Sequence, residues 1–383
     1  MTKLDGKIAH SKLGASSTGR WMNCPGSVEA TKDYPETTNI YAAEGTAAHS
    51  IGDACLKSHK DADEYLGNTI AVDEWEFEVN REMVTGVQMY LDVVRNDMEE
   101  IGSKQIYAEQ RVDLSRIHPG MFGTSDAILI KDRLLKVYDL KYGRGVVEVR
   151  ENTQALFYAV GALLLMDKHK DVAEIEMVIV QPRVVNPIKR WTVTRQYLKD
   201  WIVDLKSAAE ATTAKDAPRI PGEKQCQFCE HKTACPELKQ FALDKAMIEF
   251  DDEGDIDITE IDELAKVDIA EILKWSGFVQ NYLKAIESKA LSNLQRGEKV
   301  EGFKLVEKRA TRRLHGMGLD KDEIMSQPAL LSPAQIDKLL TKDQKVELNT
   351  GLIVKKSSGT KMVPESDPAP EVSAGVESDF ADD

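Results

Sequence analysis

Two segments in the first part of the chain carry apolar side chains at the spacing of an amphipathic helix. The first covers residues 41–58 and the second covers residues 77–102, so we predict two long helices before any strand. Residues 1–40 are rich in Ser, Gly and Thr and, apart from the RWMNCPGS segment, are predicted to be mostly loop. The apolar stripes consist of Ala48, Ile51 and Leu56 in the first segment and Met83, Val87, Tyr90 and Val94 in the second.

The apolar period then changes from that of a helix to that of short strands. Three β-rich stretches follow one another, separated by Gly, His-Pro and Lys-Asp residues that indicate turns. A strongly apolar helix, opened by Asn152 or Thr153 as its N-cap, separates them from a fourth strand. This order predicts an α/β fold whose sheet is antiparallel at first and is closed by a crossover. The strands are expected at residues 104–114, 123–131, 133–141 and 174–183, and the helices at 152–169 and 194–213.

The chain changes character after Cys235. An acidic linker leads to a long helix, a basic strand-like stretch and a short helix that begins with Ser332 and Pro333. The last residues are rich in Pro, Ser and acids and are expected to be disordered. Three parts follow: a first domain at 1–240, a helical and basic extension at 241–356 and an acidic tail at 357–383. Within the extension, the elements are expected at 261–294, 302–314 and 331–340.

The composition limits the class of protein. The 383 residues carry a net charge of −15, with the acidic excess concentrated after residue 240. Such a charge argues against a protein that coats nucleic acid through bulk attraction, although it leaves room for a local basic cleft in the first part. With five cysteines, no signal peptide and no apolar run of membrane length, the sequence predicts a cytoplasmic protein without a membrane segment. Its cysteines are then expected to serve metals or chemistry rather than disulfides.

Charged residues mark the ends of two predicted strands. Asp126 begins the second strand, and Asp139 and Lys141 lie two apart at the end of the third, so that they share a face. If the two strands are neighbours, two carboxylates and an ammonium meet at one end of the sheet. Two carboxylates suit a hard cation such as Mg²⁺, and a lysine beside them can orient a water and offset charge on a phosphate. His49, on the first predicted helix, is a further candidate ligand.

The Asp-x-Lys triplet carries little weight alone, because chance produces it in a chain of this composition. Asp204 and Lys206 repeat it within a predicted helix. A lone histidine on a helix is also more often a packed or surface residue than a ligand. The first triplet stands out because it ends a strand, and because Gln154 and Tyr158 share one face of the helix that follows. An edge glutamine and a core tyrosine are the alternative interpretation of that pair.

Three clustered cysteines leave a tetrahedral site one ligand short. Cys226, Cys229 and Cys235 lie within ten positions of one another. The candidates for the fourth ligand are His231 inside the cluster and the distant Cys24 and Cys55.

Four motifs, EGTAAH, GTSD, DLK and QALFY, in this order resemble the RecB-type branch of the PD-(D/E)XK nuclease superfamily. The resemblance implies a restriction-endonuclease-like core with a mixed central sheet flanked by helices, a Mg²⁺ or Mn²⁺ cofactor and DNA as the substrate. One departure is Ser125, which stands where many members have proline. The resemblance implies His49, Asp126, Asp139 and the Leu140 carbonyl as metal ligands, Lys141 as the catalytic lysine, and Gln154 and Tyr158 as residues that brace the site or contact DNA. Glu109 resembles the acidic residue often found on the preceding strand, and this match is the weakest.

The cysteines also resemble a pattern of this branch. Some members, AddB and the iron–sulfur nuclease of CRISPR adaptation among them, have one cysteine before the nuclease motifs and three after them, spaced Cys-x-x-Cys-x₅-Cys. By this resemblance Cys24 joins Cys226, Cys229 and Cys235 in holding a [4Fe–4S] cluster that staples the two ends of the domain. Zinc held by the same cysteines, or with His231, is the alternative. Cys55 is expected to be an ordinary buried thiol.

Three further segments, RWMNCPGS, GFKLVEKRATRRL and VPESDPAPEVSAGVESDF, resemble an uncharacterised phage and prophage family with this core, and that resemblance spans nearly the whole chain. The resemblance implies the cytoplasm of a phage-infected or lysogenic bacterial host and a role in phage DNA recombination, replication or repair. We therefore expect a metal-dependent DNA nuclease, with an exonuclease as the first choice. The alternatives are a catalytically inactive DNA-binding module and a zinc-stapled scaffold of phage assembly. A phage single-strand annealing protein is the implied partner, the oligomeric state is open, and Arg144 and Arg150 are the candidate phosphate contacts.

Overall fold

The structure is a computed structural model, in which the chain forms two compact units, residues 1–261 and 262–383. Most of the first unit and parts of the second are described. The described residues are 11–35, 39–165, 171–247, 266–308, 311–314, 325–326, 329–330, 353–356, 360–365 and 369–372.

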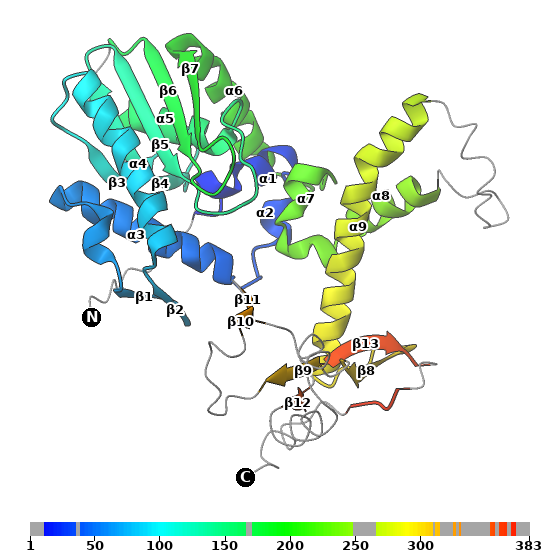
Figure 1. The fold of residues 1–383 in the computed structure, drawn as a ribbon. Coiled ribbons are helices and arrows are strands. Elements are labelled where there is room, and N and C mark those ends of the chain that lie inside the picture. The colour runs from blue at the N-terminus through cyan, green and yellow to red at the C-terminus, as the bar shows by residue number, and fades with distance from the viewer. Residues whose placement is uncertain are drawn as a thin grey trace. The chain divides into compact units, whose positions relative to one another are not determined.

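A five-stranded mixed sheet forms the centre of the first unit (Figure 1). From one edge to the other its strands are β3 (Tyr107–Asp113), β4 (Phe122–Lys131), β5 (Leu134–Leu140), β6 (Glu174–Val180) and β7 (Ile188–Thr194). β5 and β6 run parallel, joined by the crossover helix α5 (Thr153–Leu165), and the other neighbours are antiparallel. The predicted fold class, a mixed central sheet flanked by helices, is confirmed.

Helices cover both faces of this sheet (Figure 1). α3 (Ile40–Ser58) and α4 (Arg81–Glu100) lie on one face, and α5 and α6 (Arg195–Ala211) lie on the other. Strand β4 shows how alternate side chains sort between them: Leu129 packs in the apolar cluster with α3 and α4, whereas Ile128 packs in the cluster with α5 and α6. Two apolar cores result, one on each face, and burial on both faces fixes the strand register.

The two helices that border the candidate site begin at asparagine caps. The Asn39 side chain accepts hydrogen bonds from the N–H groups of Tyr41 and Ala42 at the start of α3. Asn152 Oδ1 accepts from the Ala155 N–H at 3.0 Å at the start of α5, so Asn152 is the cap among the two predicted candidates. These bonds satisfy N–H groups that have no partner within the helix.

Short strands are the elements that the sequence patterns missed. β1 (Thr69–Val72) and β2 (Trp75–Glu78) form an antiparallel hairpin, and β7 completes the sheet edge. The second predicted helix therefore starts too early, because Phe77 and Glu78 belong to β2. Such half-exposed strands depend on their pairing partner more than on their own period.

The N-terminal stretch contains short helices, and one of them extends into the RWMNCPGS segment, which was not predicted to be loop. The helical residues outside that segment depart from the predicted loop. Trp21 is fully buried in the core beside α5, and its Nε1–H donates to the Gly14 carbonyl at 3.3 Å. This anchor fixes the stretch against the sheet domain. The remaining short elements of the first unit are η1 (Ala15–Ser17), α1 (Thr18–Asn23), α2 (Ser27–Ala30), η2 (Ala62–Tyr65), α7 (Glu223–Gln227), η3 (Glu230–Thr233) and α8 (Pro236–Met247).

The second unit contains the expected long helix and basic strand. Its elements are α9 (Lys266–Gln295), β8 (Phe303–Glu307), β9 (Thr311–Leu314), β10 (Met325–Ser326), β11 (Ala329–Leu330), β12 (Ile353–Lys356) and β13 (Thr360–Pro364). β13 falls in the tail predicted to be disordered, and it is ordered because it pairs antiparallel with β8. The predicted helix at 331–340 lies outside the described residues. Within the described parts of both units, no helix is long and apolar enough to cross a membrane.

Candidate active site

Three carboxylates lie in a row across neighbouring strands of the sheet. Glu109 of β3 is opposite Asp126 of β4, because the backbone pairs on both sides of them have this register. The β4–β5 register, continued one step beyond the pair Ala127 and Tyr138, brings Asp126 opposite Asp139. The sheet therefore gathers acids that are separated by more than a dozen residues in the sequence. Like charges opposite one another are unfavourable, so the row needs cations.

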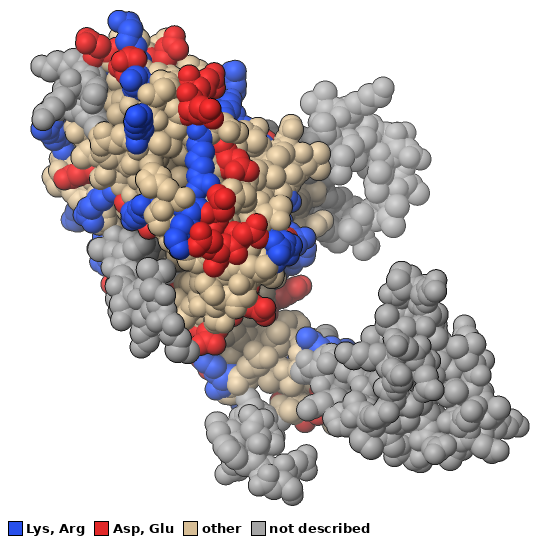
Figure 2. Space-filling view, turned by 60° about the vertical axis from the view of Figure 1, so that its left-hand side comes forward, with Lys and Arg blue, Asp and Glu red and all other residues tan. Residues whose placement is uncertain are grey.

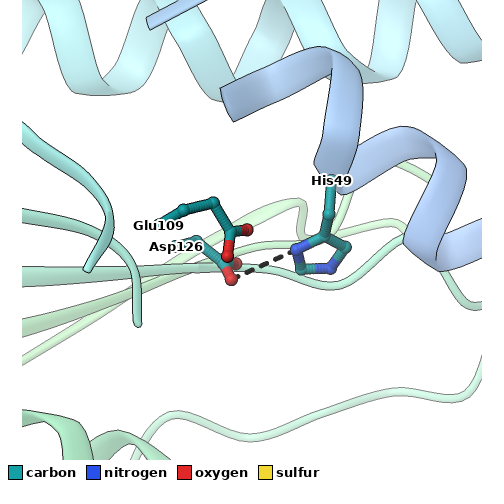
Figure 3. A group of neighbouring side chains, drawn as sticks. All are labelled: His49, Glu109 and Asp126. Atoms are coloured by element: carbon teal, nitrogen blue, oxygen red, sulfur yellow. Dashed lines mark ion pairs between the residues drawn. The ribbon is translucent and has the colours of Figure 1, made fainter. Parts of the chain in front are cut away.

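Helix α3 brings His49 to this row, and Figure 3 shows its imidazole directed at Asp126 with Glu109 beside it. His49 Nδ1 lies 3.1 Å from Asp126 Oδ1, and the Leu140 N–H donates to Asp126 Oδ2 at 2.7 Å. Ligand atoms of His49, Glu109 and Asp126 lie within 4.8 Å of one another. One nitrogen and several carboxylate oxygens at this spacing are a donor set for a divalent cation.

Lys141 connects the end of β5 to α5. Its Nζ lies 3.0 Å from Asp139 Oδ1 and 2.8 Å from Oδ2, and it donates to Gln154 Oε1 at 2.8 Å. Gln154 in turn donates to the Tyr158 hydroxyl at 3.0 Å. The predicted pairs Asp139–Lys141 and Gln154–Tyr158 thus form one hydrogen-bonded chain. This chain fixes the position of the ammonium group.

Asp139 is the most buried acid of the row, with a residue exposure of 5%. Both of its carboxylate oxygens lie beside the Lys141 ammonium, which is the cation that the described structure supplies to it. Burial raises the pKa of Asp139 against the opposing effect of Lys141. Burial also disfavours the charge of Asp126, but the His49 charge and the Leu140 N–H outweigh it and lower the pKa of Asp126.

His49 and Glu109 both have raised pKa values. Burial opposes the charge of His49, but the carboxylates of Asp126 and Asp139 outweigh it and raise its pKa to about 9. Burial and the charge of Asp126 raise the pKa of Glu109 to about 7. Without a metal, the site therefore retains protons that a bound cation displaces.

Glu109 was the weakest match to the family motifs, but the strand register places it in the row of acids, opposite Asp126. Its backbone has φ 47°, an uncommon conformation for a residue other than glycine. Local strain of this kind concentrates at functional sites. No sequence period indicates it, because the departure from regular strand geometry concerns a single residue. Only the pairing with β4 shows that Glu109 faces Asp126.

The two predicted phosphate contacts are exposed. Arg144 has a side-chain exposure of 76% and lies 3.4 Å from Glu82 of α4. Arg150 is exposed in the turn before α5. On the face shown in Figure 2, basic and acidic side chains are interspersed rather than gathered by sign. The surface therefore offers individual arginines near the site instead of a continuous basic patch on this face.

The four cysteines of the predicted cluster come together around one small pocket. Cys24 follows α1, Cys226 lies in α7, and Cys229 and Cys235 flank η3. The Ile220 N–H donates to Cys24 Sγ at 3.2 Å. Among the described residues, no three of the cysteine sulfurs lie within 4.8 Å of one another. A tetrahedral zinc site would bring them to about 3.8 Å, because a Zn–S bond measures about 2.3 Å.

The side chains of His231 and Cys55 contact residues other than these four cysteines. Tyr34 Oη lies 3.2 Å from His231 Nδ1, and an Arg219 nitrogen lies 3.4 Å from Nε2, so both ring nitrogens are occupied. Burial and the Arg219 charge lower the pKa of His231. Cys55 is buried in the apolar cluster between α3 and α4, where burial raises its thiol pKa to about 11. It is the buried thiol that the sequence predicted.

Comparison with known families identifies one that spans most of the chain. The family model described as "Protein of unknown function (DUF2800)" matches residues 10–370. The chain belongs to this family. Its description assigns no activity, so membership leaves the function to the site.

Several solved nucleases resemble the chain at low identity. A putative exonuclease from Eubacterium rectale has 12% identity, covering 60% of this chain and 92% of that one, with a TM-score of 0.32. A phage-related exonuclease from Haemophilus somnus has 16% identity, covering 54% and 94%, with a TM-score of 0.26. An alkaline exonuclease from Laribacter hongkongensis has 13% identity, covering 51% and 89%, with a TM-score of 0.23. These TM-scores are too low to assign a function to this DUF2800 protein.

Proposed function

We propose that the protein is a metal-dependent DNA nuclease, and specifically an exonuclease that hydrolyses phosphodiester bonds in phage DNA recombination, replication or repair. One observation carries the proposal: the carboxylates of Asp126 and Asp139 meet at one sheet end beside His49 and the ammonium of Lys141. The motif order expected of a RecB-type nuclease supports the same assignment.

The residues at this sheet end fit a Mg²⁺ or Mn²⁺ ion. The candidate ligands are His49, Asp126, Asp139 and the Leu140 carbonyl, and Glu109 is added because of its position. The surplus of carboxylates over cations is the feature that favours a bound ion. When bound, the ion supplies Lewis-acid stabilisation of the phosphate and lowers the pKa of water.

Lys141 is the catalytic lysine of this proposal. Its ammonium is held from two sides, by Asp139 and by Gln154, so its position at the reacting phosphate costs little reorganisation. It orients the attacking water and offsets the negative charge that develops on the phosphate. Tyr158 supports Gln154 through the hydrogen bond between them. Arg144 and Arg150 are proposed to bind the DNA backbone, and each such contact adds to the salt dependence of binding.

A digestion assay tests the proposal. The purified protein is incubated with end-labelled linear DNA and with covalently closed circular DNA, in Mn²⁺, Mg²⁺ or EDTA. We expect the linear DNA to be shortened from its ends in either cation, the circle to survive, and EDTA to stop the reaction. Cutting of the circle would indicate an endonuclease instead. DNA binding without any cutting would support the inactive DNA-binding module.

We further propose that Cys24, Cys226, Cys229 and Cys235 hold a [4Fe–4S] cluster. Their convergence on one pocket and the resemblance of their sequence spacing to that of iron–sulfur nucleases support this cluster, in which each thiolate would bind a different iron. Backbone N–H groups directed at Cys24 and Cys226 would stabilise the thiolates. Anaerobic purification tests this: a brown protein with broad absorbance is expected, whereas a colourless protein with one zinc per chain would support the zinc-stapled alternative.

The biological setting is part of the proposal. The family resemblance favours the cytoplasm of a phage-infected or lysogenic bacterium, with DNA as the principal partner. A phage single-strand annealing protein is the protein partner that this setting favours, because an exonuclease exposes the single strand that such a protein binds. Co-purification of the two from infected cells, with and without nuclease treatment, tests the contact.

A further inference from the structure

Tyr90 of α4 is a buried tyrosine beside the candidate site. In the sequence it is one member of the apolar stripe of its helix, and nothing there indicates a separate role. Its residue exposure is 2%, and its hydroxyl makes no hydrogen bond within the described structure. A buried hydroxyl without a partner destabilises a fold, and native structures contain few of them. An unpaired hydroxyl at a binding site indicates a partner that arrives with the ligand.

The ring of Tyr90 lies under α3 close to His49. A Cβ atom built on Gly52 would lie 3.4 Å from Tyr90 Cε1, so the absence of a side chain at Gly52 makes room for the ring. Gly52 follows His49 by three positions and shares its helix face. Burial raises the pKa of Tyr90, and the charges of Asp126 and Glu109 raise it further. The hydroxyl is therefore within electrostatic reach of the two acids.

Glu109 is the second group of this region that lacks a partner. No hydrogen bond or ion pair to its carboxylate occurs within the described part of the chain, although Asp126 lies directly opposite. Its backbone is held at φ 47°, which costs conformational energy. Near the candidate cation site, the Tyr90 hydroxyl is thus a buried donor without an acceptor, and the Glu109 carboxylate is a half-buried acceptor without a donor from the described residues.

We propose that Tyr90 is a positioning residue for Glu109: when a divalent cation occupies the site, the Tyr90 hydroxyl donates a hydrogen bond to the Glu109 carboxylate and holds it as a ligand. The inference rests on the cation site of the proposed function and adds a residue to it from α4. The bond satisfies both groups at once and explains why a polar atom is kept among Val87, Ala127 and other apolar neighbours.

Tyr138 provides a matched control. It belongs to the same apolar cluster and is fully buried, but its hydroxyl donates to Asp97 Oδ2 at 2.8 Å. Removing the Tyr138 oxygen should lower stability with or without cation, because Asp97 loses a donor. Removing the Tyr90 oxygen should leave the stability of the cation-free protein unchanged or slightly raised, because no bond is lost.

The experiment measures Mn²⁺ binding to the full-length protein by titration calorimetry, with urea unfolding of the cation-free protein in parallel. Tyr90→Phe should weaken Mn²⁺ binding about three- to tenfold, the range of one hydrogen bond, without lowering the unfolding midpoint. Glu109→Gln should also weaken binding. In a Glu109→Ala background, which has no acceptor at this position, Tyr90→Phe should have no further effect. Tyr138→Phe should show the opposite pattern, with a lower midpoint and parent Mn²⁺ affinity.

Parent affinity in Tyr90→Phe, or additive losses in the double variant, would overturn the inference. A Tyr90→Phe protein with a clearly lower midpoint in the absence of cation would also contradict it, because the hydroxyl would then have a structural partner. A protein that binds Mn²⁺ through Asp126 but cuts no DNA would overturn the proposed function alone and leave the role of Tyr90 standing. A parent protein that binds no Mn²⁺ would overturn both.

Discussion

The chain contains the tripeptide Asp-Leu-Lys twice, and the two copies have different surroundings. In the first copy, Asp139 and Lys141 end strand β5, share a face and contact each other at 2.8 Å. In the second copy, Asp204 and Lys206 lie on α6, and both are exposed. Lys206 there approaches only Glu210, one helical turn away, at 3.8 Å.

The backbone conformation explains the difference. Residues two apart point the same way on a strand, whereas on a helix they point to different sides. The strand copy also has neighbours on β4 and α5, among them Asp126 and Gln154, that complete a site. The same three residues are therefore a catalytic candidate in one place and a solvated helix surface in the other.

A second comparison separates the candidate site from a structural charge cluster on the same sheet. Asp97 and Glu176 are matched there by Lys136 and Arg190, and Tyr138 donates a further hydrogen bond. The charges of that cluster balance. In the candidate site, three carboxylates face one lysine and one histidine, so the negative charge is in excess. A buried cluster whose charges balance is typical of a structural role, because removing one partner destabilises the fold. A cluster with an excess of negative charge is a candidate for binding a cation.

The largest expected effect concerns the two tripeptides. Lys141→Ala should lower the single-turnover rate of DNA cleavage by about a thousandfold, because the charge on the phosphate loses its partner. Asp139→Ala should abolish metal-dependent cleavage. Lys206→Ala and Asp204→Ala are the matched controls and should cut at nearly the parent rate. Loss of activity in the α6 variants with activity retained in the β5 variants would show that the wrong copy had been assigned.

The balanced cluster should respond in stability rather than in cleavage. Asp97→Asn should lower the free energy of unfolding by about 3–5 kcal/mol, measured in urea, because it leaves Arg190 and Lys136 without their buried partner. Burial opposes the charge of Asp97, but Arg190 outweighs it and lowers its pKa below the ordinary 3.8. Its contribution is therefore present above pH 3.8 and is lost as the pH falls through the lowered value. An Asp97→Asn protein with parent stability at pH 7 would contradict the structural role.

Neutralising an acid of the candidate site should raise the free energy of unfolding instead of lowering it. The pKa of Glu109 is raised from 4.5 to about 7 by burial and by Asp126, so the cation-free fold loses stability as the pH rises from about 4.5 to about 7, and the full loss is present above 7. Glu109→Gln should raise the free energy of unfolding by about 1 kcal/mol at pH 8 without cation and by little at pH 4. A drop in stability at pH 8 would show that Glu109 is part of a balanced cluster as well.

The smallest effect is expected at the end of the hydrogen-bonded chain behind Lys141. Tyr158→Phe removes the bond to Gln154, which should lower the cleavage rate about tenfold because the ammonium is less firmly held. Gln154→Ala should cost more, since it contacts Lys141 directly. Both proteins should fold as the parent does, by circular dichroism and unfolding midpoint. Cleavage at the parent rate in both variants would make the pair structural only.

Local sequence determined the elements whose pattern is strong. The helical stripe that includes Met83 and Val94 predicted α4, and alternation and β-branched composition predicted β3, β4 and β5. The cap of α5 was narrowed to Asn152 or Thr153, because a cap acts on N–H groups close in sequence, and the hydrogen bond from the Ala155 N–H decides for Asn152. The gathering of four cysteines around one pocket was also anticipated by their spacing and family resemblance. Each of these properties depends on residues close in sequence or on a motif.

The tertiary structure decided which of these residues act together. Pairing of β3 with β4 and of β4 with β5 brought Glu109 and Asp139 to either side of Asp126. Packing of α3 over the sheet brought His49 to the same place. β13, in the tail predicted to be disordered, forms through its pairing with β8. Register, burial and charge balance are properties of pairs distant in sequence, and no period within one segment contains them.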